Sequence, residues 1–219
     1  MTVRQVHGAR LYDGRMRLIG EIDPARPLLV VACAEEAAHL GPDLPVLLTG
    51  MGKVNASTAL ATVLARGPHP SEVVNLGTAG ALRPGLEGTV HQVGTVFQHD
   101  LDTDFLRGLT GETVGAPLAL DLPDGAVGGV VLATGDLFVA EESARRRLAE
   151  RAHLVDMEGY AVAGAARAAG VPVRLFKHVS DEATEGADRT WRESVDASAR
   201  ILADWARQEF GPARSATAL

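Results

Sequence analysis

Acidic residues stand at three places where predicted strands and helices meet. Glu158 opens an apolar helix, and Asp181 follows a strand. Glu35 and Glu36 follow another strand in the same way. Ligands of open α/β folds bind at the carboxyl edge of the parallel strands, so we expect carboxylates from all three places to converge on one crevice. Acids grouped in this way suit proton-transfer chemistry, with a polyol or a cationic transition state as the expected guest.

The elements that must position these acids alternate between strands and helices along the chain. The alternation predicts a single-domain, three-layer α/β/α fold, with a central sheet that is mixed but mostly parallel and helices on both faces. We expect strands over 28–32, 45–49, 72–76, 90–97, 130–133, 155–156 and 171–179, and helices over 54–66, 141–151, 160–169 and 190–210.

No internal repeat or linker divides the chain, and we predict one domain over residues 28–210. Residues 1–27 are expected to form a hairpin or an irregular lead-in, with a turn at Asp13-Gly14. The polar, Gly- and Pro-rich stretch 99–129 predicts a long loop or an irregular excursion. The tail 211–219 is expected to be flexible.

Composition narrows the classes of function. The chain has 219 residues, which is enough for one domain with an ample core, and its formal net charge is -7. This negative charge argues against nucleic acid or an anionic membrane as the main partner. The single cysteine, Cys33, excludes an intramolecular disulfide, and no Cys/His spacing predicts a zinc site.

Targeting signals are not evident in the sequence. Its first residues lack the apolar segment of a signal peptide, and no run is long and apolar enough to span a bilayer. We therefore predict a soluble, cytoplasmic protein.

Six short runs stand at predicted element boundaries. They are Cys33-Ala-Glu-Glu36, Gly50-Met-Gly-Lys-Val-Asn55, Asn75-Leu-Gly-Thr-Ala-Gly80, Gly135-Asp-Leu-Phe138, Asp156-Met-Glu-Gly159 and Val179-Ser-Asp181. Their order resembles the nucleoside phosphorylase and nucleosidase superfamily. The resemblance covers roughly residues 28–210 and is closest to the hydrolase branch, the 5'-methylthioadenosine/S-adenosylhomocysteine nucleosidases. It implies the fold of that superfamily, a small-molecule nucleoside as substrate and a homodimer; we expect no cofactor and no metal.

Asp181 is the candidate acid. Breaking an N-glycosidic bond leaves positive charge on the ribose and negative charge on the departing purine, so catalysis needs a proton donor at the base. Burial at the end of an apolar strand would raise the pKa of Asp181 and keep it protonated for transfer to purine N7. The resemblance implies that Asp at this position suits 6-aminopurines whereas Asn suits 6-oxopurines, which favours adenine as the leaving group.

Two further acids complete the proposed chemistry. Glu158 is the candidate for binding the ribose hydroxyls, and its charge would favour an oxocarbenium-like transition state. The neighbouring Met157 is expected to pack against the sugar. Glu36 matches the family best as the base that activates the attacking water, with Glu35 as a solvated neighbour.

The remaining candidates come from the resemblance. Thr78, in a predicted Gly-rich turn, corresponds to a small hydroxyl residue near the water. Phe138 is expected to stack on the purine and the backbone of Val139 to bind its edge, while Ser180 is placed with the substrate-binding residues. Trp191 either packs under the terminal helix or lies over the purine.

The absence of phosphate donors favours hydrolysis over phosphorolysis. A phosphate co-substrate needs several donors, usually arginines, around a dianion. The phosphorylases carry a Gly-Asp-Pro loop after the first strand and an Arg before the Gly-rich turn. This chain has Cys33-Ala-Glu-Glu36 and Val74-Asn75-Leu76 at those positions, and an acidic pair would repel phosphate.

Other interpretations stay open. A phosphate-dependent purine nucleoside phosphorylase and a non-catalytic nucleoside-binding protein are the alternatives at the level of function. Taken singly, Glu158 and Asp181 could be no more than residues that cap helix N-termini. The substituent on the ribose 5'-carbon is also open, because the stretch 99–129, which helps to shape that part of the pocket in the family, departs from the family pattern.

Overall fold

A computed structural model describes residues 5–6, 9–12, 16–122, 128–183 and 187–211. The predicted turn at Asp13-Gly14 and the tail beyond Gly211 lie outside these residues. No helix in the described part of the chain is long and apolar enough to cross a membrane.

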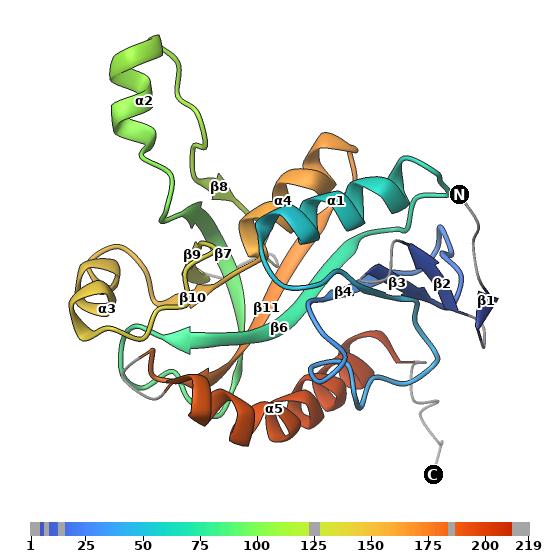
Figure 1. The fold of residues 1–219 in the computed structure, drawn as a ribbon. Helices are drawn as coiled ribbons and strands as arrows, with labels where there is room; N and C mark the ends of the chain where they lie inside the picture. The colour runs from blue at the N-terminus through green and yellow to red at the C-terminus, as the bar shows by residue number, and fades with distance from the viewer. Residues whose placement is uncertain (1–4, 7–8, 13–15, 123–127, 184–186, 212–219) are drawn as a thin grey trace.

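The strands form one mixed, eleven-stranded sheet (Figure 1). Its members are β1 (Gln5–Val6), β2 (Ala9–Tyr12), β3 (Met16–Ile19), β4 (Leu28–Val31), β5 (Val46–Leu48), β6 (Val73–Ala81), β7 (Val90–Gln98), β8 (Leu118–Ala119), β9 (Val130–Thr134), β10 (Leu154–Asp156) and β11 (Val173–Asp181). β2 and β3 form an antiparallel pair, and β3 continues the sheet by pairing with β5.

Two parallel runs of strands are joined by antiparallel pairs. β5, β4, β6 and β11 are parallel neighbours, and so are β10, β9 and β7. β10 pairs antiparallel with β6, and β7 pairs antiparallel with β11. The strands β6, β10, β9, β7 and β11 therefore close into a ring. Gly80 of β6 faces both Val155 of β10 and Asp181 of β11, so the ends of two strands meet at the long third one.

Helices cover both faces of the sheet, which confirms the three-layer architecture. α1 (Lys53–Leu64) and α4 (Gly159–Ala168) lie side by side on one face, and α5 (Ala187–Phe210) lies on the other (Figure 1). Ala56 and Ala59 of α1 and Ala163 and Ala166 of α4 are buried in one core cluster with the sheet. Their small side chains allow the two helices to pack closely. Under α5, Leu202 belongs to a second cluster with residues of β4 and β11. α3 (Glu142–Ala149) packs at the edge of the fold.

The stretch 99–129 contains a helix that the sequence analysis missed. α2 (Thr103–Thr110) stands away from the body of the molecule (Figure 1). Its first turn is capped by Asp102, which accepts a hydrogen bond from Phe105 N at 2.9 Å, and its end by Gly111 in the left-handed conformation at φ 76°. None of its residues is buried, so the helix depends on its caps. The stretch does leave the body of the fold, as predicted, but the prediction that it is irregular is wrong, because it contains α2.

The Gly-rich turn predicted around Thr78 is also wrong. β6 continues through Gly77 and Gly80 to Ala81 as one strand. These glycines admit neighbouring side chains rather than turn the backbone. An ideal Cβ at Gly77 would lie 3.3 Å from Glu36 Oε1 and 3.3 Å from Lys177 Nζ, and one at Gly80 would lie 3.0 Å from Asp181 Oδ1. Glycine thus brings the candidate acids against the strand.

Candidate active site

One pocket collects residues from both parallel runs of strands. Ala32, Cys33 and Glu36 follow β4, Thr78, Ala79 and Gly80 belong to β6, Val155 to Glu158 lie at the end of β10, and Ser180 and Asp181 end β11. Met51, Leu137, Phe138, Val139 and Trp191 complete the lining. The sheet does not offer a single parallel edge here, because β10 runs antiparallel to β6. The carboxylates nevertheless converge as expected.

Glu36 is buried and held by Thr78. Its Oε1 accepts hydrogen bonds from Thr78 N at 2.6 Å and from Thr78 Oγ1 at 2.7 Å. Its Oε2 lies 3.8 Å from the Cys33 thiol. Burial and the charge of Glu36 raise the pKa of Cys33 to about 12, so Cys33 stays a thiol and is not a nucleophile at neutral pH. Glu35, by contrast, is exposed.

Glu158 precedes α4 without capping it. Its side chain makes no hydrogen bond to the helix and instead accepts one from Gly52 N at 2.7 Å, at the start of α1. The interpretation of Glu158 as a helix cap is therefore wrong. Burial and the charge of Asp156 raise the pKa of Glu158 to about 8, against the opposing effect of the Lys177 ammonium.

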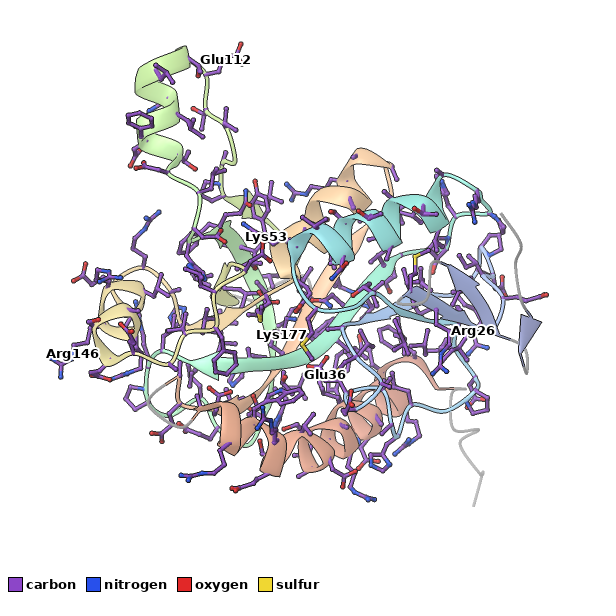
Figure 2. The ribbon with its side chains drawn as sticks, in the orientation of Figure 1. Arg26, Glu36, Lys53, Glu112, Arg146 and Lys177 are labelled. Atoms are coloured by element: carbon purple, nitrogen blue, oxygen red, sulfur yellow. The ribbon has the colours of Figure 1, made fainter. Side chains whose placement is uncertain are left out.

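Asp156 is the residue that secures the start of α4. Its Oδ2 accepts from Gly159 N at 2.8 Å and from Lys177 Nζ at 2.8 Å, and its Oδ1 accepts from Thr134 Oγ1 at 2.6 Å. Figure 2 shows Lys177 and Glu36 close together in the middle of the molecule, beside β6. The pocket therefore has a buried cation behind its carboxylates.

Asp181 ends β11 with both oxygens bonded. Ala183 N donates to Oδ1 at 2.9 Å and Ser180 Oγ donates to Oδ2 at 2.8 Å. Burial raises the pKa of Asp181, and these two hydrogen bonds oppose the rise without cancelling it. The residue does not open a helix, because it is the last residue of β11 and the next two residues, Glu182 and Ala183, are not helical.

The apolar part of the lining is more open. Phe138 is 50% exposed and Leu137 is 69% exposed, while Val139 beside them is buried. Asp136 ties this segment to α1, since its Oδ1 accepts from Lys53 N at 2.7 Å. A flat ligand can therefore lie against an accessible ring on an anchored segment.

All eight residues predicted for the site line this pocket: Glu36, Thr78, Phe138, Val139, Met157, Glu158, Ser180 and Asp181. Sequence reasoning did not predict Asp156 or Lys177 as functional residues. The available signals were a second acid two residues before Glu158 and a lysine within the predicted strand 171–179. Trp191, for which the sequence allows a place under the terminal helix or over the purine, lines the pocket and donates from Nε1 to Thr78 Oγ1 at 2.9 Å. Among the described residues, no group of three or more His, Cys, Asp or Glu side chains could hold a metal ion.

Several known proteins are similar to this chain. A 5'-methylthioadenosine/S-adenosylhomocysteine nucleosidase of Geobacillus sp. strain WCH70 is 27% identical, with 84% of this chain and 88% of the relative covered. One of Exiguobacterium sp. is 29% identical over 69% of this chain and 72% of the relative.

Solved structures show the same fold. The Streptococcus pneumoniae MTA/SAH nucleosidase in complex with 8-aminoadenine has a TM-score of 0.68 at 26% identity, and 82% of this chain and 96% of that one are covered. A futalosine hydrolase mutant of Helicobacter pylori has a TM-score of 0.71 at 20% identity, over 84% of this chain and 97% of that one.

A family model extends this similarity to most of the sequence. Residues 38–208 match the model of the phosphorylase superfamily, which spans every lining segment except the one that carries Glu36. The chain belongs to the phosphorylase superfamily.

Proposed function

We propose that the protein hydrolyses the N-glycosidic bond of adenine nucleosides, releasing adenine and a ribose derivative. The observation that carries the proposal is the convergence of Glu36, Glu158 and Asp181, all buried, on one pocket. Relatives named 5'-methylthioadenosine/S-adenosylhomocysteine nucleosidase support it, and so does the similar structure complexed with 8-aminoadenine. Methylthioadenosine, S-adenosylhomocysteine and related 5'-modified adenosines are the proposed substrates.

Each acid has a distinct part in this reaction. Asp181, whose pKa is raised by burial, donates a proton to purine N7 as the bond between C1' and N9 breaks and its electron pair passes to the base. Glu36 takes a proton from the water whose oxygen bonds to C1'. Glu158, whose pKa is raised to about 8, binds the ribose hydroxyls, and in its ionised form it favours the cationic sugar of the transition state. Phe138 stacks on the purine.

The remaining substrate contacts follow from placing the purine at Asp181 and the ribose at Glu158. Met157 packs against the sugar, the backbone of Val139 binds the purine edge, and Thr78 lies beside the attacking water. Ser180 donates to Asp181 Oδ2 and so holds the acid in place.

Hydrolysis is favoured over phosphorolysis by the charge of the lining. None of the described lining residues is Arg, Lys or His, and the carboxylates would repel a phosphate dianion. Lys177, a buried cation beside Gly77 and Glu36, forms an ion pair with Asp156.

The test is detection of free adenine from methylthioadenosine, S-adenosylhomocysteine, 5'-deoxyadenosine and adenosine, with and without phosphate. Adenine and free sugar formed equally in both buffers support the proposal and order the 5'-groups. Turnover that requires phosphate and yields a sugar phosphate would establish a phosphorylase instead. Binding of these nucleosides without base release would establish a binding protein.

A homodimer and a cytoplasmic location belong to the same proposal. α2 projects from the body of the molecule (Figure 1). Phe105, Leu109 and Val114, on or next to this helix, have exposed apolar side chains that a second copy could cover. Light scattering of the purified protein tests the dimer, and a molar mass of one chain at micromolar concentration would contradict it.

A further inference from the structure

Trp191 reaches the candidate base through an intermediate hydroxyl. It lies near the start of α5, far from β6 in sequence, yet its Nε1 is 2.9 Å from Thr78 Oγ1. The same hydroxyl is 2.7 Å from Glu36 Oε1. Three separate parts of the fold thus meet in one chain of hydrogen bonds.

The direction of this chain is fixed by its first member. An indole N–H can only donate, so the Thr78 oxygen must accept from Trp191. The hydroxyl proton of Thr78 is then directed at Glu36, where the Thr78 backbone N–H already donates to the same oxygen at 2.6 Å. Without Trp191 the hydroxyl could rotate and donate elsewhere.

The two oxygens of Glu36 are consequently unequal. Oε1 accepts hydrogen bonds from both donors of Thr78, whereas the one hydrogen-bond partner of Oε2 within the described part of the chain is the weakly donating Cys33 thiol at 3.8 Å. Oε2 is therefore the oxygen available to take a proton from water.

A hydrogen bond between α5 and β11 fixes the position of Trp191 relative to the pocket. Ser194, one turn further along α5, donates from Oγ to Ser180 O at 2.8 Å. This bond ties the first turns of α5 to β11 next to Asp181. The start of α5 is thereby held at a fixed position relative to β11, the strand that carries Asp181.

We propose that Trp191 is a positioning residue for the reaction: its indole N–H fixes the Thr78 hydroxyl as a donor to Glu36 and leaves Oε2 of Glu36 to accept the proton of the attacking water. This inference rests on the proposed role of Glu36 as the base. It assigns a function to the terminal helix, which otherwise serves as a covering layer.

The test is a double-mutant cycle on adenine release. Trp191→Phe keeps an aromatic ring but removes the donor, and Thr78→Val removes the hydroxyl while keeping the side-chain shape. We expect Trp191→Phe to lower kcat roughly tenfold, the upper end of the scale of one lost hydrogen bond between neutral groups, with KM changed less than about threefold. In the Thr78→Val background, Trp191→Phe should cause almost no further decrease in kcat. Thr78→Ser, which retains the hydroxyl, should recover most of the kcat that Thr78→Val loses.

Several outcomes would overturn the proposal. Unchanged kcat in Trp191→Phe would do so, as would a rise in KM alone, which would make Trp191 only part of the pocket wall. Losses that multiply in the double variant would show that the two residues act separately. If Trp191→Phe fails to fold, equal activity of Thr78→Val and Thr78→Ser would still contradict the proposal, because the Thr78 hydroxyl would then have no effect on turnover. Failure of the proposed function is distinguishable, because the unmodified chain would then release no adenine.

Discussion

Lys177 Nζ lies 2.8 Å from Asp156 Oδ2, and neither side chain is more than 2% exposed. Burial alone would lower the pKa of Lys177, but the charges of Asp156 and Glu158 outweigh it and hold that pKa above its ordinary value. Asp156 has its other oxygen bonded to Thr134, so the pair is well satisfied. A buried, paired cation allows several carboxylates to share one pocket, because it offsets part of their mutual repulsion.

Removing this cation should affect both stability and the site. Lys177→Met keeps the unbranched shape and most of the length of the side chain but leaves Asp156 as an unpaired buried charge. The free energy of unfolding should therefore fall by about 3–5 kcal/mol in urea denaturation. Lys177 also lowers the pKa of Glu158, so its loss raises that pKa further. If ionised Glu158 is the active form, the acidic limb of kcat/KM should then move to higher pH.

The matched control removes the opposing charge as well. In Lys177→Met/Asp156→Asn no buried charge of this pair remains, and much of the lost stability should return. A double variant no more stable than the single one would contradict the pairing as the source of the loss.

Glu158 should make stability depend on pH. Its pKa is raised from 4.5 to about 8 in the folded protein, so the folded state holds a proton that the unfolded state releases. Stability from this group is therefore present below about pH 4.5 and is lost as pH rises toward about 8. Glu158→Gln resembles the protonated form at every pH, and we expect it to melt at a higher temperature than the parent at pH 8 but not at pH 4.5.

The same variant separates stability from activity. Glu158→Gln should lose most adenine release, since the carboxylate proposed to bind the ribose is gone, while becoming the more stable protein. Differential scanning calorimetry across the pH range provides the measurement. A melting-temperature difference that is constant with pH would rule out the raised pKa as its cause.

Replacing Gly80 by a residue with a side chain should impair both the stability of the protein and its activity. An ideal Cβ there would lie 3.0 Å from Asp181 Oδ1, 3.0 Å from Ala183 Cβ and 3.2 Å from Val155 Cγ1. Gly80→Ala must displace at least one of these atoms, so we expect a loss of about 1–3 kcal/mol in unfolding free energy and impaired turnover. Thermal unfolding and the adenine assay measure the two effects.

Gly164 in α4 is the control for that substitution. A Cβ at Gly164 meets nothing within 4 Å, and alanine favours a helix over glycine by about 0.5–1 kcal/mol. Gly164→Ala should therefore stabilise the protein and leave turnover unchanged. If Gly80→Ala behaved in the same way, the crowding around Gly80 would not matter.

The order of elements and the convergence of the acids could be predicted from the sequence, for physical reasons. Leu28 to Val31 is an uninterrupted apolar run that is fully buried, and Val173 to Val179 is a mostly buried strand although it includes Arg174, Lys177 and His178. Burial on both faces favours apolar residues in such strands. Acids directly after such runs must lie at a strand end, where a pocket can form.

Pairing across the sheet could not be predicted in this way. The sequence of a strand does not specify which strands it pairs with. The antiparallel pairing of β10 with β6 and the closure of the ring are therefore evident only in the structure. Gly77 and Gly80 were misinterpreted for a related reason: glycine allows both turns and close approach, and only the positions of Glu36 and Asp181 decide between them. The partner of Lys177 lies 21 positions earlier in the sequence, on another strand.

The adjacent acids Glu35 and Glu36 provide the sharpest test of the proposed base. Glu36 is 6% exposed and bonded to Thr78, while Glu35 is exposed. Glu36→Gln keeps an oxygen for the Thr78 donors but cannot take a proton from water, so kcat should fall by about 10²–10⁴-fold with little change in melting temperature. Glu35→Gln makes the same chemical change one residue away and should retain full turnover. Steady-state kinetics on methylthioadenosine compare the two. Equal losses in both variants would point to local disturbance of the segment, and normal turnover in Glu36→Gln would mean that another group activates the water.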